Sequence, residues 1–423
     1  MESTVANNQL LRFTTAGSVD DGKSTLIGRL LYDSKSLFED QISSIESASK
    51  RKGLEDIDLA MFTDGLKDER EQGITIDVAY RYFTTPKRKF IIADTPGHIQ
   101  YTRNMVTGAS TANVALILVD ARNGIIEQTK RHSFIASLLA IPHIIVCINK
   151  MDLVNYSEEI YNQIVANYQS ISAEMEKTDI RFIPISALNG DNVVNPSQNM
   201  PWFNGNPLLA ELETIEIEND INQEEFRLPV QTVIRPQSKE FHDFRGYVGR
   251  IASGTIKKGE EILLLPTQKK STIKNIFVGN KEIDQAFAPM SICVTIADDI
   301  DIARGDMMVE IKNLPTESKE IEVMLCWLNE NPSRPRAKYT IKHATTEMKG
   351  MIAEILYKVD INSFNQIKDD SPLEVNQICR AKIKLASSIY ADLYKKNKIT
   401  GSIILIDENT NETVAAGTIV KSN

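Results

Sequence analysis

Near its N-terminus the chain reads Gly17-Ser18-Val19-Asp20-Asp21-Gly22-Lys23-Ser24, directly after the strand-like run Leu11–Ala16. This stretch, called the phosphate loop below, fits the pattern G-x-x-x-x-G-K-[ST] of a strand-to-helix turn that cradles phosphates. Its glycines let backbone N–H groups curl around the anion, Lys23 reaches the β and γ phosphates, and Ser24 offers a hydroxyl to Mg²⁺. A helix from about Ser24 to Tyr32 aims its positive end at the same phosphates. The stretch therefore predicts a nucleotide site on an α/β domain.

A second predicted strand, Ile91-Ile92-Ala93, ends in Asp94-Thr95-Pro96-Gly97-His98. A carboxylate at this strand end can hold Mg²⁺ through water, and the backbone N–H of Gly97 can reach a γ-phosphate. This segment predicts the metal-binding side of the site.

The choice of base is predicted by Asn149-Lys150-Met151-Asp152, which follows the strand Ile144–Ile148. An Asp carboxylate can accept hydrogen bonds from both N1–H and the exocyclic amine of guanine. Adenine has an acceptor at that ring nitrogen and no amine beside it, so Asp152 favours GTP over ATP. Ser186-Ala187-Leu188, after a further strand, can support the base by a backbone N–H.

The hydrophobic pattern divides the chain into two textures. Short apolar runs alternate with longer amphipathic stretches in the first part, which indicates a parallel sheet covered by helices. The apolar runs there are Phe90–Ala93, Val114–Val119, Ile144–Ile148 and Phe182–Ile185, and the amphipathic stretches are Glu127–Leu139 and Glu158–Glu174. After Leu228, β-branched runs broken by Gly recur at Val230–Ile234, Tyr247–Ile251, Glu261–Leu265 and Ile292–Ile296. We expect an α/β P-loop domain at 1–217, with a mostly parallel sheet and flanking helices, and small antiparallel β-barrels at 227–315 and 318–423.

Composition narrows the class of protein. The 423 residues carry 48 Lys and Arg against 57 Asp and Glu, a net charge of −9, so nucleic acid is not an expected partner. Membrane association is not expected either, because no apolar run approaches the ~20 residues of a membrane span. The N-terminus lacks the basic and apolar blocks of a signal peptide, and the four Cys lie far apart. We therefore expect a cytoplasmic protein.

The four motifs, in this order and each after a predicted strand, resemble the GTPase superfamily, and the strand-rich second half resembles its translation-factor branch. Longer strings resemble the large, GTP-hydrolysing subunit of bacterial sulfate adenylyltransferases. They are Asp64-Gly65-Leu66, Glu69–Phe83, Tyr101–Met105, Gln128–Ser133, Met200–Phe203, Asp243–Tyr247 and Thr400–Asp407. Translation elongation factors usually carry His where this chain has Asp21, which favours the second resemblance.

The resemblance implies two further roles. Thr75 is similar to the threonine of the first switch, which closes on Mg²⁺ and the γ-phosphate, and His98 to the histidine that positions the attacking water. We expect catalysis by His98, Lys23 and Thr75, and metal binding by Ser24, Thr75 and Asp94. The residues expected to contact the nucleotide are Gly17, Ser18, Val19, Asp20, Asp21, Gly22, Lys23, Ser24, Thr25, Asp94, Thr95, Pro96, Gly97, His98, Asn149, Lys150, Met151, Asp152, Ser186, Ala187 and Leu188.

The resemblance also implies an activity. GTP hydrolysis by such a subunit drives the uphill synthesis of adenosine 5′-phosphosulfate and pyrophosphate from ATP and sulfate on a separate small catalytic subunit. We expect GTP and Mg²⁺ as cofactors and, as partner, the small subunit, in a heterodimer or a higher assembly. Adenylylsulfate kinase activity, which some relatives carry, is not expected, because the chain shows no second G-x-x-x-x-G-K-[ST]. The alternative is a translation elongation factor-type GTPase, which would have to bind tRNA in its GTP state.

Overall fold

The structure is a computed structural model that describes residues 10–35, 43, 49, 59–62, 77–98, 101–173, 178–217, 221–236 and 244–422. It divides into two units. The first comprises Met1–Ile217 with Ile361–Phe364, and the second comprises Glu218–Asp360 with Asn365–Asn423. The predicted switch string around Thr75 lies outside the described residues. The predicted domain boundaries, 1–217, 227–315 and 318–423, stay a prediction.

The first unit is built on a six-stranded sheet in the order β2-β3-β1-β4-β5-β6. Its strands are β1 (Leu10–Ala16), β2 (Ala79–Thr84), β3 (Lys89–Asp94), β4 (Val114–Asp120), β5 (His143–Asn149) and β6 (Asp179–Pro184). The helices are α1 (Lys23–Asp33), α4 (Thr102–Ala109), α5 (Glu127–Leu138), α6 (Glu158–Ser172) and α7 (Leu208–Thr214), with 3₁₀ turns η1 (Leu59–Phe62) and η3 (Met151–Val154). Strand β2 runs antiparallel to β3, and the other neighbours run parallel. The predicted mostly parallel sheet is confirmed.

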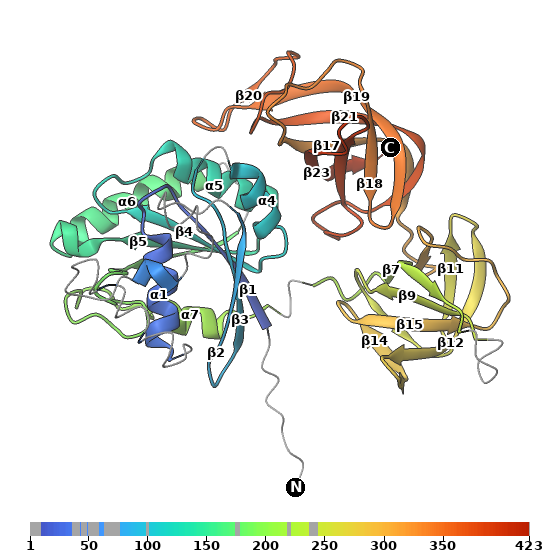
Figure 1. The fold of residues 1–423 in the computed structure, drawn as a ribbon, viewed down its shortest axis with the longest axis horizontal. Helices are drawn as coiled ribbons and strands as arrows, with labels where there is room; N and C mark the ends of the chain where they lie inside the picture. The colour runs from blue at the N-terminus through green and yellow to red at the C-terminus, as the bar shows by residue number, and fades with distance from the viewer. Residues whose placement is uncertain are drawn as a thin grey trace, which may run out of the picture. The chain divides into compact units, whose positions relative to one another are not determined.

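Helices cover both faces of this sheet, with α1 and α7 on one face and α4, α5 and α6 on the other (Figure 1). All seven residues of β4 are buried, as expected for a central parallel strand covered on both faces. Leu26 and Leu30 of α1 and Leu212 of α7 join the core that also contains Phe13 and Phe90. Because β1, β3, β4 and β5 run parallel, the loops after them meet at one edge of the sheet.

The second unit contains the two predicted antiparallel β-barrels. The first barrel consists of β7 (Arg227–Pro229), β8 (Thr232–Ile234), β9 (Gly246–Arg250), β10 (Thr255–Lys257), β11 (Glu261–Leu265), β12 (Lys269–Val278), β13 (Lys281–Ile283), β14 (Gln285–Phe287), β15 (Ser291–Ile296) and β16 (Met307–Val309). Most of its strands follow the order β7-β16-β11-β12-β15-β9-β8. The predicted strand Val230–Ile234 is shorter in the structure, because Val230 and Gln231 lie between β7 and β8.

The second barrel consists of β17 (Thr316–Trp327), β18 (Lys338–His343), β19 (Thr346–Val359), β20 (Gln366–Ile367), β21 (Ile378–Ala391), β22 (Ser402–Asp407) and β23 (Thr413–Ser422). Six of them form the sequence β18-β22-β23-β17-β21-β19, and pairing of β18 with β19 closes the ring. A closed ring leaves these six strands without a free edge.

A buried ion pair ties the two barrels together within the second unit. Arg227 is 1% exposed, and its Nε and Nη2 donate to the two carboxylate oxygens of Asp392 at 3.0 and 3.1 Å. The hydroxyl of Thr400 donates to the same carboxylate at 2.7 Å. The carboxylate is therefore fully engaged, as a buried charge requires.

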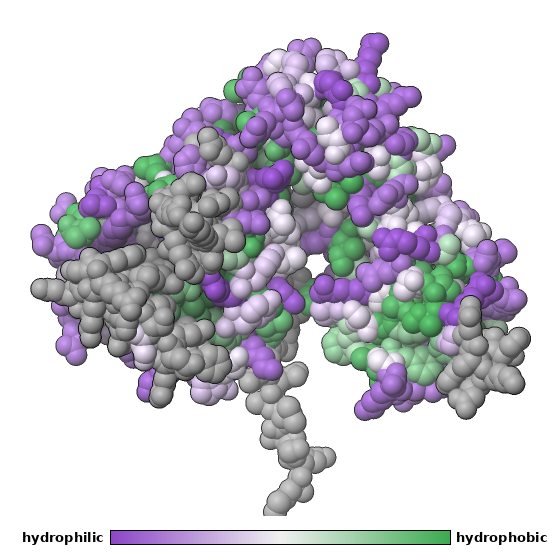
Figure 2. Space-filling view, in the orientation of Figure 1, coloured by the Kyte–Doolittle hydropathy of each residue, from purple (hydrophilic) through white to green (hydrophobic). Residues whose placement is uncertain are grey.

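The surface shown in Figure 2 is largely hydrophilic, with apolar side chains gathered over part of the first barrel. Within the part of the chain that the structure describes, none of the helices combines the length and the apolar character needed to cross a membrane.

Candidate nucleotide-binding site

The phosphate loop leaves β1 and enters α1 at Lys23. Gly22 has φ 90°, and a Cβ there would meet Nδ2 of Asn149 at 2.5 Å, so glycine is required on both counts. The Lys23 side chain is buried, and its Nζ donates to the carbonyls of Gly17 and Ser18, each at 2.9 Å. Burial lowers the pKa of Lys23, and the carboxylate of Asp94 opposes that shift. The loop thus holds one desolvated cation at the amino end of an 11-residue helix, which suits a phosphate group.

Asp21 stabilises the phosphate loop by a hydrogen bond within the loop. Its Oδ2 accepts from the backbone N–H of Ser18 at 2.5 Å, and its side chain is 4% exposed. Burial raises the pKa of Asp21, while the bond from Ser18 and the charge of Lys23 oppose the rise. Asp21 therefore stabilises the curvature of the phosphate loop.

Asp94 ends β3 beside Thr15 of β1, its partner in the sheet register. The Thr15 hydroxyl donates to Oδ1 of Asp94 at 3.0 Å, and the aspartate is 2% exposed. Together with the Ser24 hydroxyl in the first turn of α1, this carboxylate offers the oxygen ligands that Mg²⁺ prefers. The donor set therefore fits Mg²⁺, which proteins usually hold by one or two carboxylates together with substrate phosphates.

Gly97 packs directly against the phosphate loop. A Cβ at this position would collide with Nζ of Lys23 and with the carbonyl oxygen of Gly17. The next residue, His98, is exposed, and its ring lies edge-on to Tyr101 at 6.2 Å between centroids. His98, the predicted water-positioning histidine, therefore directly follows the residue that packs against the phosphate loop.

Asn149 connects the phosphate loop to the predicted base-binding loops. Its Nδ2 donates to the carbonyl of Asp21 at 2.8 Å, and its Oδ1 accepts from the backbone N–H of Ala187 at 2.9 Å. The Ser186 hydroxyl donates to Oδ1 of Asp152 at 2.7 Å, which orients that carboxylate. Lys150 donates to the carbonyl of Asp20. Three segments distant in sequence thus form one hydrogen-bonded site.

All the predicted site residues except Thr75 lie within the described residues. Thr95, Pro96 and Met151 are buried, so they support the loops from inside. Thr95, for example, donates its hydroxyl to the carbonyl of Thr15 at 2.5 Å. Leu188 is 60% exposed and presents an apolar side chain next to the loop that holds Ala187.

Sequence reasoning missed Asp120, at the end of β4. Nζ of Lys150 lies 2.9 Å from its Oδ2, and Arg122 binds both carboxylate oxygens. Burial alone would raise the pKa of Asp120, but the hydrogen bonds from Arg122 and Lys150 outweigh it and hold this pKa well below its usual range. Its position directly after an apolar strand is the signal that identified Asp94, and it could have been read in the same way.

Arg29 of α1 was also missed. Its Nε donates to the carbonyl of Ala187 at 3.2 Å, and its Nη2 donates to the carbonyl of Leu188. No sequence pattern connects α1 with this loop, because the contact depends on how helix and loop pack.

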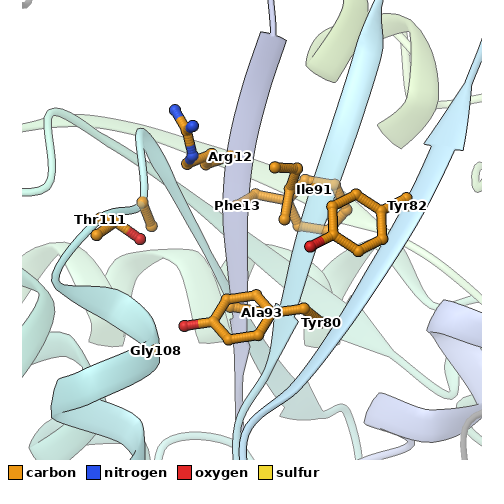
Figure 3. Close-up of a pocket in the computed structure, with 9 residues that line it drawn as sticks. Arg12, Phe13, Tyr80, Tyr82, Ile91, Ala93, Gly108 and Thr111 are labelled. Carbon is orange, nitrogen blue, oxygen red and sulfur yellow. The ribbon is translucent and has the colours of Figure 1, made fainter. Parts of the chain in front are cut away.

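A separate pocket of about 280 Å³ opens on the sheet face beside α4 (Figure 3). Tyr80 and Tyr82 of β2 project over it, with Arg12 and Thr111 on its opposite side. None of the predicted site residues lines this pocket. It is therefore distinct from the phosphate and base loops.

Comparison with known proteins identifies domain families along the chain. Residues 8–230 match the elongation factor Tu GTP binding domain, residues 247–309 match elongation factor Tu domain 2, and residues 320–420 match the GTP-eEF1A C-terminal domain-like family. Among solved structures, the crystal structure of Sup35 complexed with GDP aligns over 98% of this chain and 95% of its own. Its sequence is 22% identical and the TM-score is 0.45.

Among curated relatives, sulfate adenylyltransferase subunit 1 of Pseudoalteromonas atlantica is 53% identical over 97% of this chain and 87% of its own. The bifunctional enzyme CysN/CysC of Rhodopirellula baltica is 53% identical over 97% of this chain, which spans 64% of that longer protein. These names do not favour the translation-factor alternative. The chain therefore belongs to the sulfate adenylyltransferase subunit 1 family, as a GTPase with a nucleotide-binding domain of the elongation factor Tu type.

Proposed function

We propose that this chain binds GTP with Mg²⁺ and hydrolyses it, and that hydrolysis drives adenosine 5′-phosphosulfate synthesis from ATP and sulfate on a small catalytic subunit. The proposed GTP binding rests on the two hydrogen bonds of the Asn149 side chain. They join the phosphate loop to the loop of Ala187. The name of the relatives, sulfate adenylyltransferase subunit 1, supports the proposed role in sulfate activation. Pyrophosphate is the second product of that reaction.

The residues of the site divide the work of phosphoryl transfer, which is mostly positioning and charge neutralisation. Lys23 supplies positive charge to the β and γ phosphates, and the Gly97 N–H is a donor for the γ-phosphate. Asp94 and Ser24 hold Mg²⁺, which neutralises phosphate charge when bound. His98 orients the attacking water, and Thr75 completes the metal and γ-phosphate contacts.

Base selection falls to Asp152. Its Oδ1 already accepts from the Ser186 hydroxyl at 2.7 Å, so the carboxylate is oriented before a nucleotide arrives. Preorganised hydrogen-bonding groups bind with less loss of side-chain entropy. The two donors on the guanine edge are the partners that this carboxylate fits.

We also propose a cytoplasmic heterodimer with the small catalytic subunit. The words "subunit 1" in the relatives' names support a partner, and four Cys far apart in the sequence suit a reducing compartment.

The test is co-purification of the full chain with the product of the neighbouring gene that encodes the small catalytic subunit, followed by an assay of adenosine 5′-phosphosulfate. Synthesis should rise on addition of GTP and not on addition of its non-hydrolysable analogue. Synthesis at the same level without GTP, or failure of the two chains to associate, would contradict the proposal.

A further inference from the structure

One turn of α5 carries three polar side chains into the interior. Gln128 is 6% exposed, Thr129 0% and His132 2%. Side chains of these types are seldom fully buried, and buried polar atoms nearly always have hydrogen-bond partners. Here Gln128 Oε1, Thr129 Oγ1 and His132 Nδ1 have no partner among the described residues. Burying polar atoms without hydrogen bonds costs free energy, so this arrangement in α5 indicates a role beyond packing.

The Gln128 amide makes two specific contacts. Its Nε2 lies 3.2 Å from the carbonyl oxygen of Gly97 and 3.0 Å from Nε2 of His132. An amide nitrogen carries two hydrogens, so it can donate one to each acceptor. This requires His132 Nε2 to be unprotonated.

The protonation state of His132 meets that requirement. Burial and the nearby positive charges of Lys23 and Arg131 lower the pKa of His132 to about 3. The imidazole is therefore neutral at neutral pH. The contact with the Gln128 amide nitrogen then requires the tautomer that carries its proton on Nδ1 and a lone pair on Nε2. His132 thus fixes which way the Gln128 amide points.

The second contact acts on the site already described. Gly97 lies against Lys23 and the Gly17 carbonyl so closely that a Cβ has no room. Because the peptide unit is planar, a hydrogen bond to the Gly97 carbonyl also fixes the direction of the His98 N–H. The amide of Gln128 therefore controls how the chain passes from Gly97 to His98.

We propose that Gln128 is a positioning residue for GTP hydrolysis, which holds the Gly97–His98 peptide in place while His132 orients the Gln128 amide. The inference rests on the proposed function, because it takes His98 as the group that orients the attacking water. Gln128 reaches the reaction only through Gly97 and His98. A small misplacement of a positioned group costs as much as a hundredfold in rate.

Substitution of Gln128 should lower the rate of GTP turnover and leave the affinity for GDP unchanged. GDP lacks the γ-phosphate that Gly97 faces in the proposed function, whereas Lys23, Asn149 and Asp152 hold the parts common to both nucleotides. A purely structural role for Gln128 would instead weaken GDP and GTP together. The informative measurement is therefore the change in GTP turnover compared with the change in GDP affinity.

The test measures kcat and KM for GTP, and Kd for GDP, on the full chain and its complex with the small subunit. Gln128→Met keeps the length of the side chain and removes the donor, and it should lower kcat about tenfold with KM and the GDP Kd within twofold. Gln128→Glu keeps size and polarity and should show the same loss, so the result does not depend on one variant folding. His132→Leu removes only the orienting acceptor and should give a smaller loss of kcat.

Tyr168→Phe is the matched control. It removes the 2.8 Å hydrogen bond from Tyr168 to Ser133 on the next turn of α5 and touches neither Gly97 nor His98. Its kcat should equal that of the unmodified chain. Unchanged kcat in both Gln128 variants, or a GDP Kd that rises in proportion, would overturn the inference. An unmodified chain that fails to bind or hydrolyse GTP would instead refute the proposed function.

Discussion

In the proposed function, base selection depends on Asp152. Asp152→Asn keeps the size of the side chain but turns one acceptor into a donor, so GTP binding should weaken by about tenfold or more. Xanthosine triphosphate should bind the variant better, because its O2 can accept from the new amide. Nucleotide titrations of both proteins with both triphosphates check this prediction. An unaltered GTP affinity would show that Asp152 does not contact the base.

His98 should act on turnover rather than on binding. His98→Ala is expected to lower GTP turnover by about tenfold or more, because it removes the group that we propose to orient the attacking water. GTP affinity should change little, since the phosphate loop holds the nucleotide. Steady-state hydrolysis and a nucleotide titration separate the two quantities.

A histidine at the opposite edge of the same sheet provides the control. His143 begins β5, whereas the candidate site lies after the carboxyl ends of the parallel strands. His143→Ala should therefore leave turnover unchanged. Lost binding with normal turnover in His98→Ala would indicate a structural histidine.

At the scale of the element, closure of the second barrel depends on one glycine in β19. A Cβ at Gly350 would lie 2.7 Å from Cγ1 of Ile341 in β18 and 2.9 Å from the carbonyl oxygen of Lys384 in β21. Gly350→Val should therefore lower the free energy of unfolding by about 1–3 kcal/mol through overpacking. Urea unfolding followed by circular dichroism measures the change.

A valine substitution at an exposed residue of β19 separates the effect of steric crowding on stability from the effect of β propensity. Ala353 is exposed, so Ala353→Val adds a branched side chain without such contacts and should cost little. Equal stability of Gly350→Val and the unmodified chain would mean that the seam between β18 and β19 is looser than the structure indicates.

At the scale of the whole molecule, we expect the isolated chain to hydrolyse GTP slowly and to make no adenosine 5′-phosphosulfate. The chain contains one phosphate loop motif and one Asp proposed to select the base in 423 residues. A nucleotide switch does work only through a partner that distinguishes its states. The assay supplies the purified chain with ATP, sulfate, Mg²⁺ and GTP. Sustained synthesis without the small subunit would reveal an active site in this chain that the motifs do not mark.

Lys23→Ala tests coupling in the assembled complex. The loss of its charge should abolish the GTP-dependent part of sulfate activation, because the β and γ phosphates lose their main cation. Assembly with the small subunit should persist, and gel filtration checks it. Lys87→Ala is the control, since that exposed lysine pairs with Glu213 at 2.8 Å and lies outside the phosphate loop. GTP-stimulated synthesis by Lys23→Ala would contradict the role of the phosphate loop.

Much of the fold and the site could be predicted from local chemistry. The phosphate loop needs glycine at fixed spacing, and a buried parallel strand needs a continuous apolar run, so the sequence predicts β1, β3, β4 and β5. The polar residues that follow three of these strands could be assigned to one nucleotide site, because the motifs in this order resemble those of the GTPase superfamily. The order of the motifs along the chain also indicated the family.

Only the tertiary structure decided which distant groups meet. Asn149 and Asp21 are separated by 128 residues, and Gln128 reaches a carbonyl 31 residues away. Periodicity marks which face of an element is buried, but not which element covers it. The sequence therefore could not predict three contacts: the hydrogen bond of Asp21 within the phosphate loop, that of Arg29 to the Ala187 carbonyl, and the pairing of β18 with β19. Each depends on tertiary packing, which local propensity does not determine.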